Sequence, residues 1–292
     1  MNNIHMRFPG GRNKALTLSY DDGVEQDARL IEIMKENGLK GTFNINSGEY
    51  SEEGTTFEPG NVHRRMTRAA AQKLYKDSGM EVAVHGLTHP FLEQLPENIC
   101  TYEILQDRIN LEREYDAIVR GMAYPFGTYN DSVVESIRKC GIVYSRTVIE
   151  TERFDIPTDW LRLETTCHHN CPRLMELART FVGECDKKSD RENVLWGAPK
   201  LFYLWGHSYE FEINDNWNVI EEFAGYIGGR DDVWYATNIE IYDYIAAYKQ
   251  LIFDTEATKV YNPTAYELYF VAYRKLWCVK PGERKLIISK TS

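Results

Sequence analysis

Short, mostly apolar runs alternate with amphipathic stretches along most of this chain. The strand-like runs cover residues 15–20, 41–46, 80–84, 201–204 and 233–235. Between them, apolar residues recur at the three- and four-residue spacing of a helix face, as in residues 28–34, 99–119 and 239–251. Thr67 is suited to begin one of these helices and Gly38 to end another. This alternation predicts a parallel sheet with helical crossovers.

Two architectures fit the pattern, a closed (β/α) barrel and a doubly wound open sheet. In a barrel the carboxyl ends of all strands gather at one mouth, where ligands bind. A chain of 292 residues buries roughly 75% of its unfolded surface, enough for one large domain. From residue 252 the helical pattern gives way to strand-like segments and to the turn pairs Asn262-Pro263 and Pro281-Gly282. We therefore expect an α/β domain over residues 1–251 and a small β appendage over residues 252–292, packed on that domain.

Composition limits the kinds of binding partner and the cellular location that we expect. The formal charge of −10 argues against a nucleic-acid partner, because phosphate binding depends on clustered Lys and Arg. No apolar run approaches a membrane span, and residues 1–7 lack the apolar core of a secretion signal. We expect a cytoplasmic protein with no membrane partner and with reduced cysteines. A structural zinc site at Cys167 and Cys171 is the less favoured interpretation of the one local cysteine cluster. No sequence feature decides the oligomeric state.

The most informative polar motifs directly follow two of the strand-like runs. Tyr20-Asp21-Asp22-Gly23 ends the first run, and His85-Gly86-Leu87-Thr88-His89 follows residues 80–84. Taken alone, Asp-Asp-Gly is more typical of a turn. Together, one carboxylate and two imidazoles form a ligand set for a divalent ion with open coordination positions, and the second carboxylate stays free for proton transfer. The two motifs therefore predict a hydrolytic metal site.

These motifs resemble those of the polysaccharide deacetylase family, which is carbohydrate esterase family 4 and is also called the nodulation-type deacetylase homology domain. The similarity covers roughly residues 12–250 and includes Gly41-Thr42-Phe43 and Gly79-Met80-Glu81-Val82. Family members are distorted (β/α) barrels that hydrolyse N- or O-acetyl groups, mostly on aminosugar polymers. The resemblance therefore implies a distorted (β/α) barrel of the polysaccharide deacetylase type and a hydrolase that uses zinc, with cobalt, nickel or manganese as alternative ions.

The resemblance also implies a role for each motif residue. Asp22 would bind the metal together with His85 and His89, and Asp21 would accept a proton from the attacking water. His207 follows the strand at residues 201–204 and matches the last family motif. It would donate the proton that the leaving amine needs.

Further residues are expected to line the substrate site. Tyr124-Pro125-Phe126 matches the third family motif and would form a groove wall, with a backbone N–H near Phe126 as an oxyanion donor. The predicted substrate-binding residues are Tyr124, Pro125, Phe126, Asp159, Trp160, Arg162 and Trp205. His168 and His169 are interpreted as structural or rim residues.

Two positions depart from the family pattern. Ala123 stands where family members usually carry an arginine that holds the catalytic aspartate, and Trp205 stands in the place of a leucine. We expect Arg162 to take over the contact with Asp21. A bulkier wall at Trp205 would narrow the acetyl pocket or reshape the sugar subsite.

The sequence thus predicts a metal-dependent hydrolase that removes an acyl group, N-acetyl in the first place, from an aminosugar or oligosaccharide. The partner would be a carbohydrate or another small acylated substrate. The same motifs leave open a deformylase or other deacylase and an O-acetyl esterase. A non-catalytic carbohydrate-binding protein on the same scaffold is a further alternative, motivated by the missing arginine at Ala123.

Overall fold

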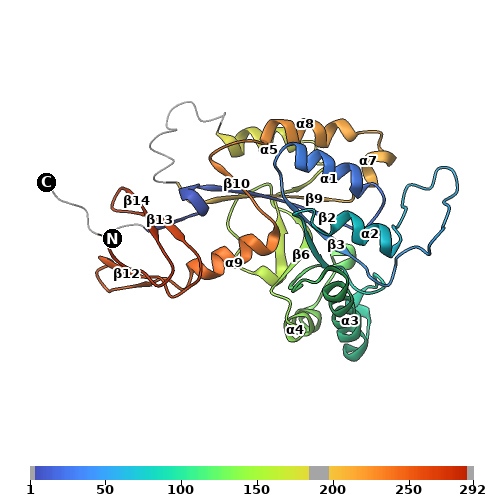
Figure 1. Cartoon of the computed structure of the whole chain (residues 1–292), viewed down its shortest axis with the longest axis horizontal. Helices are drawn as coiled ribbons and strands as arrows, with labels where there is room; N and C mark the ends of the chain where they lie inside the picture. Colours follow the sequence, from blue (N-terminus) through green and yellow to red (C-terminus); the bar gives the residue numbers. More distant parts are fainter. Residues whose placement is uncertain (1–3, 184–196, 288–292) are drawn as a thin grey trace.

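The computed structural model describes residues 4–183 and 197–287, and its centre is a curved parallel sheet (Figure 1). The strand order is β7-β6-β5-β4-β3-β2-β9-β8, and β10 pairs with the first residues of β2. All of these pairs are parallel, as the alternation of strands and helices predicts. The strands of this sheet are β2 (Lys14–Asp21), β3 (Gly41–Ile45), β4 (Glu81–Val84), β5 (Gly121–Ala123), β6 (Tyr144–Glu150), β7 (Leu163–Thr165), β8 (Cys167–His168), β9 (Lys200–Gly206) and β10 (Val233–Tyr235).

Residues 163–168 join the two edges of the sheet. Their first part, β7, pairs with β6, and their last part, β8, pairs with β9. Between them, the amide of Thr166 donates a hydrogen bond of 2.9 Å to the carbonyl of Tyr203 in β9. The sheet therefore curls back on itself, in agreement with the expected distorted (β/α) barrel rather than with a flat open sheet.

Helices cover the outside of the sheet, with α1, α5 and α8 on one side and α3 and α4 on another (Figure 1). Thr67 caps α2 as expected, since its hydroxyl accepts a hydrogen bond from the amide of Ala70. Gly38 follows α1 with a φ of 67°, the left-handed conformation that suits glycine. The helices are α1 (Asp27–Glu36), α2 (Arg68–Tyr75), α3 (Glu97–Tyr115), α4 (Asp131–Lys139), α5 (Leu174–Val182), α7 (Glu210–Ile213), α8 (Trp217–Ile227) and α9 (Asn238–Tyr248), with short 3-10 turns at Pro9–Gly11, Leu92–Gln94, Pro125–Gly127 and Trp160–Arg162.

The amino end of α9 contacts the first residues of β3 and β4. Glu81, the first residue of β4, is partly buried there, and its carboxylate accepts hydrogen bonds from the amide of Ile239 at 2.9 Å and the hydroxyl of Thr42 at 2.8 Å. The hydroxyl of Tyr144 donates a third hydrogen bond, at 2.6 Å. A carboxylate at a helix amino end suits the helix dipole.

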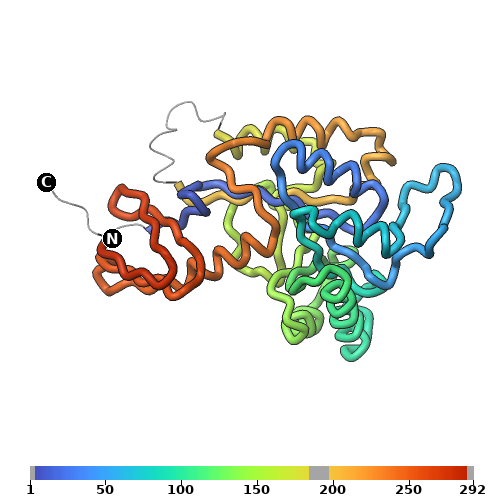
Figure 2. Tube along the Cα trace, viewed as in Figure 1, coloured from blue at the N-terminus to red at the C-terminus, as the bar shows by residue number. Residues whose placement is uncertain are grey.

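Two small antiparallel sheets lie at the far end of α9 (Figures 1 and 2). One has the strand order β1-β13-β14 and the other the order β11-β12-β15. Their strands are β1 (His5–Arg7), β11 (Ile252–Phe253), β12 (Lys259–Tyr261), β13 (Leu268–Ala272), β14 (Lys275–Val279) and β15 (Arg284–Leu286). The strands expected after residue 252 are therefore present, and they include a partner from the start of the chain. The division into domains at residue 251 stays a prediction.

Two expectations from composition can be compared with the fold. Within residues 4–183 and 197–287, no helix combines the length and the apolar character needed to span a bilayer. The thiols of Cys100, Cys140, Cys167, Cys171 and Cys278 are free, and Cys185 lies outside the described residues. The cytoplasmic location stays a prediction.

Candidate metal centre

The three predicted metal ligands meet at the carboxyl end of the sheet. Asp22 follows β2, and His85 and His89 follow β4. Ligand atoms of the three side chains all lie within 4.8 Å of one another. Nε2 of His89 lies 3.7 Å from Oδ1 of Asp22, and Nε2 of His85 lies 3.9 Å from the same oxygen. Because β2 and β4 flank β3 in a parallel sheet, their carboxyl ends open at the same mouth.

Local hydrogen bonding prepares His85 to bind a cation. Its Nδ1 lies 2.9 Å from the carbonyl oxygen of Ala123 and so carries the proton, which leaves the lone pair on Nε2. That Nε2 is buried and makes no hydrogen bond to the described residues. Burial lowers the pKa of His85 to about 4, so the imidazole is neutral near pH 7. A neutral, unpaired imidazole nitrogen beside a carboxylate fits a divalent ion such as Zn²⁺.

Asp22 is held by a loop that extends from the barrel between β3 and α2 (Figure 2). Nη2 of Arg65 lies 3.1 Å from Oδ1 of Asp22, and Nε2 of His63 lies 3.2 Å from Oδ2. Burial raises the pKa of Asp22, but the hydrogen bond with His63 and the charge of Arg65 outweigh it, so that the pKa is well below its usual range. Asp22 has a φ of 85°, which breaks the alternation of a strand and lets two consecutive aspartates serve the same mouth.

Asp21 is buried beside this ligand group. Its Oδ1 accepts a hydrogen bond of 2.8 Å from the side-chain amide of Asn44, and its Oδ2 accepts one from Nη2 of Arg146. Nε2 of His207 lies 3.7 Å from Oδ2 and Nε2 of His85 lies 3.8 Å from it. Burial raises the pKa of Asp21, but the guanidinium of Arg146 outweighs this effect and lowers the pKa. Asp21 is therefore an ionised carboxylate that can accept a proton.

His207 is oriented by Glu210, the first residue of α7. Nδ1 of His207 lies 3.3 Å from Oε1 of Glu210, which leaves Nε2 directed at Asp21. The other oxygen of Glu210 lies 3.1 Å from Nε2 of His168 and 3.0 Å from Nε2 of His169. Burial lowers the pKa of His207, but Glu210 and the two aspartates raise it above its usual value. A histidine held in this way can carry a proton into the site. His168, His207 and Glu210 also lie within 4.8 Å of one another, close enough to hold a cation.

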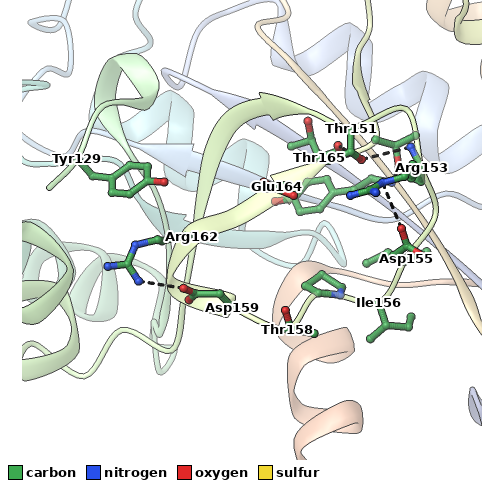
Figure 3. A pocket seen from close by; sticks show the side chains of 14 residues that line it. Tyr129, Thr151, Arg153, Asp155, Ile156, Thr158, Asp159, Arg162, Glu164 and Thr165 are labelled. Atoms are coloured by element: carbon green, nitrogen blue, oxygen red, sulfur yellow. Dashed lines mark hydrogen bonds and ion pairs between the residues drawn. The ribbon is translucent and has the colours of Figure 1, made fainter. Parts of the chain in front are cut away.

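The expectation that Arg162 holds Asp21 is wrong. Nη1 of Arg162 lies 2.9 Å from Asp159, and its Nη2 lies 2.6 Å from Asp131. Arg162 and Asp159 line a cavity between the segment after β6 and the start of β7, with a volume of about 400 Å³. Figure 3 shows their side chains together in its wall. The arginine that contacts Asp21 is instead Arg146. A substrate role for Asp159 and Arg162 stays a prediction.

The third motif, Tyr124-Pro125-Phe126, has two buried side chains and one exposed side chain. Tyr124 is 1% exposed and its hydroxyl donates to the carbonyl of Leu161, so its side chain supports the loop and does not face a substrate, which corrects its predicted role. Pro125 is buried as well. Phe126 is 48% exposed, with a φ of 59° that is unusual for a bulky residue. Its ring stacks on the ring of Phe91, with 3.9 Å between the ring centroids. The rings of Phe126 and His89 are in a T-shaped arrangement, with 4.5 Å between their centroids.

The two predicted tryptophans have different surroundings. Trp205 is buried below Arg146, whose guanidinium carbon lies 4.6 Å from the centre of the indole ring. Trp160 packs edge-on against Tyr242 at 5.2 Å and belongs to the apolar core near α9. The structure thus places Trp205 beside Arg146, which contacts Asp21, and packs Trp160 against Tyr242 of α9.

Sequence reasoning missed five residues that contact this centre, namely Asn44, His63, Arg65, Arg146 and Glu210. Arg146 had a weak signal, because it is a charge within the strand Tyr144–Glu150. Glu210 follows His207 by three residues, a spacing typical of contact within one helical turn. The loop residues His63 and Arg65 carry no comparable pattern.

Comparisons with known proteins agree with this geometry. A family model described as polysaccharide deacetylase matches residues 9–145. No curated protein matches the chain. A crystal structure of a Mycobacterium smegmatis protein proposed to be a polysaccharide deacetylase is 16% identical, covers 85% of this chain and 96% of its own, and has a TM-score of 0.55. This similarity supports the same fold.

Two further solved structures are more distant. A family 4 carbohydrate esterase from Streptomyces lividans in complex with acetate is 16% identical, with 77% of this chain and 93% of that chain covered and a TM-score of 0.46. The Streptococcus pyogenes deacetylase PplD in complex with acetate is 22% identical, with a TM-score of 0.43. The match covers 50% of this chain and 61% of the PplD chain. Residues 9–145 thus match the polysaccharide deacetylase family model, and the chain shares its fold with the Mycobacterium smegmatis structure.

Proposed function

We propose that this protein is a metal-dependent deacetylase that removes the N-acetyl group from an aminosugar or a short oligosaccharide. The observation that carries the proposal is the unpaired, buried Nε2 of His85 beside Asp22 and His89. Asp21 and His207 lie next to this group. Asp21 is an ionised carboxylate that can accept a proton, and His207, whose pKa is raised, can donate one. A metal site flanked by a base and an acid is what hydrolysis of an amide needs.

The proposed roles follow from these contacts. A divalent ion, for which we propose zinc, would be held by Asp22, His85 and His89 and would polarise the acetyl carbonyl and acidify water. Asp21, fixed by Arg146 and Asn44, accepts the proton of the attacking water. Nε2 of His207 gives a proton to the nitrogen as the carbon–nitrogen bond breaks, so that acetate and a neutral amine are released.

A carbohydrate substrate is supported by the aromatic pair at the mouth. Phe91 and Phe126 are 41% and 48% exposed and stack at 3.9 Å, and the edge of His89 contacts Phe126. Exposed apolar rings beside a metal ligand suit a ligand with one apolar face, such as a pyranose ring. The rings would hold the sugar next to the proposed ion.

The proposal is tested by acetate release from N-acetylated chito-oligosaccharides, with protein stripped by a chelator and then reloaded with Zn²⁺. We expect activity only in the reloaded protein, and a loss of at least about 1,000-fold in kcat for Asp21→Asn, because the general base is removed. Asp232→Asn is the matched control, since Asp232 is half exposed and pairs with Lys14 away from the site. Full activity after complete metal removal would refute the metal role.

The same assay separates the alternative functions. N-formyl and O-acetyl versions of the substrate identify a deformylase or an esterase by their higher kcat/KM. A carbohydrate-binding protein would bind the oligosaccharides in calorimetry and release no acyl group from any of them. Either result would refute N-deacetylation as the function.

A further inference from the structure

Arg146 is a fully buried arginine at the centre of the site. It lies in β6, and its side chain is 1% exposed. Its polar contacts go to Oδ2 of Asp21 and to the carbonyl of Thr147, while the flat face of the guanidinium lies over the indole of Trp205. A buried arginine persists only where its charge is paired and its planar face is packed, and this one has both partners.

We propose that Arg146, braced by Trp205, is the positioning residue for Asp21, and that it acts from β6 in place of the arginine absent at Ala123. The inference rests on the proposed deacetylase function. It extends that function by assigning the orientation of the base to two residues that sequence comparison with the family does not mark.

The register of the sheet explains how an arginine can act from this strand. Ala123 in β5 and Arg146 in β6 are direct partners. Partner residues on neighbouring parallel strands point to the same face of a sheet, with the strands about 4.8 Å apart. Side chains at the two positions therefore enter the same space inside the barrel. Ala123 is fully buried and small, which leaves room for the guanidinium of Arg146.

Trp205 supports the guanidinium of Arg146 in this position. It lies in β9 and pairs with Ser19 of β2, two residues before Asp21. Its ring supplies the π face on which the guanidinium rests, at 4.6 Å, and a leucine at this position has no such face. The two departures of this chain from the family pattern, Ala123 and Trp205, are thus parts of one linked substitution around Arg146.

The consequence for Asp21 is a fixed carboxylate plane. One oxygen is held by Asn44 and the other by Arg146, so the carboxylate cannot rotate without breaking a contact. In this orientation Oδ2 stays 3.7 Å from Nε2 of His207. Because the contacts of Arg146 go to the base and not to a proposed metal ligand, its replacement should reduce the rate of the chemical step and leave metal content intact.

The test compares four variants as full-length, Zn²⁺-loaded protein in the acetate-release assay: Arg146→Lys, Arg146→Ala, Trp205→Leu and the double variant Ala123→Arg/Arg146→Ala. The double variant returns a guanidinium to the same space from β5 and keeps the backbone carbonyl of residue 123 that orients His85. Arg120→Lys is the matched control, because Arg120 pairs with Asp243 outside the site. Bound Zn²⁺ and the thermal midpoint are measured for every protein.

We expect kcat to fall at least about 10-fold in Arg146→Lys and about 3- to 10-fold in Trp205→Leu, with KM and bound Zn²⁺ unchanged, because lysine lacks the planar fork and leucine the π face. The double variant should recover at least about 10-fold over Arg146→Ala, a rescue that restored folding alone does not produce at equal thermal midpoints. Arg146→Lys within two-fold of the parent would overturn the inference, as would a folded double variant no more active than Arg146→Ala. An inactive parent protein would instead refute the proposed function.

Discussion

Glu81→Gln should change how the stability of this protein depends on pH. Glu81 is partly buried at the start of β4, where Thr42, Tyr144 and Ile239 donate hydrogen bonds to it. Glutamine has the same shape. Its amide oxygen can accept the hydrogen bonds from Thr42 and Ile239, and its NH₂ group can donate to the hydroxyl of Tyr144. The variant therefore keeps the network and removes only the ionisation.

The magnitude follows from the pKa of this group. Burial raises the pKa of Glu81 from 4.5 to about 7, against the opposing effect of its hydrogen bonds. Between these values the unfolded chain has lost the proton and the folded chain has kept it. The free energy of unfolding therefore falls as pH rises, by up to about 1.4 kcal/mol per pH unit and by about 3 kcal/mol over the whole interval. Glutamine does not titrate, so the variant lacks this loss.

The assay is urea unfolding followed by tryptophan fluorescence, for the parent, Glu81→Gln and the exposed control Glu36→Gln, at several values between about pH 4.5 and 7.5. The free energy of Glu81→Gln relative to the parent should rise by about 3 kcal/mol from the acid to the neutral end of the range. Asp27 and Asp107, whose pKa values burial also raises to about 7, contribute equally to both proteins and cancel in this difference. Parallel curves for the parent and Glu81→Gln would refute the reasoning.

Two further predictions concern residues near the proposed metal site at the carboxyl end of the sheet. Glu210→Gln should lower kcat about 10- to 100-fold, because it removes the carboxylate that lies 3.3 Å from Nδ1 of His207 and helps to raise the pKa of this histidine, while the protein still binds one Zn²⁺ per chain. Two ions per parent chain, measured by atomic absorption, would instead indicate that His168, His207 and Glu210 hold a metal. Phe126→Ala should raise KM for oligosaccharides about 3- to 10-fold, because it removes the stacking surface formed with Phe91. An unchanged KM would place the sugar elsewhere.

The sequence predicted the features that depend on short spacing. The three proposed metal ligands, Asp22, His85 and His89, lie just after strands. Because the carboxyl ends of parallel strands lie at the same end of the sheet, such residues come close together regardless of the conformation of the connecting loops. Arg146 could not be assigned in this way, since it contacts Asp21 across a separation of 125 residues that only the curvature of the sheet brings together. Arg162 was expected to hold Asp21, but it is paired with Asp159 and Asp131 instead. Tyr124 matched a motif, but its ring is buried and its hydroxyl donates to the carbonyl of Leu161.

The pairing of β1 with β13 has a practical consequence for the length of an active fragment. Residues from both ends of the described chain share one three-stranded sheet, so a protein cut after residue 251 would lose the partner of β1 and expose its edge to intermolecular pairing. Shortened versions should therefore keep this sheet whole. A circular permutant that links the two ends and opens the chain at an outer loop would preserve it.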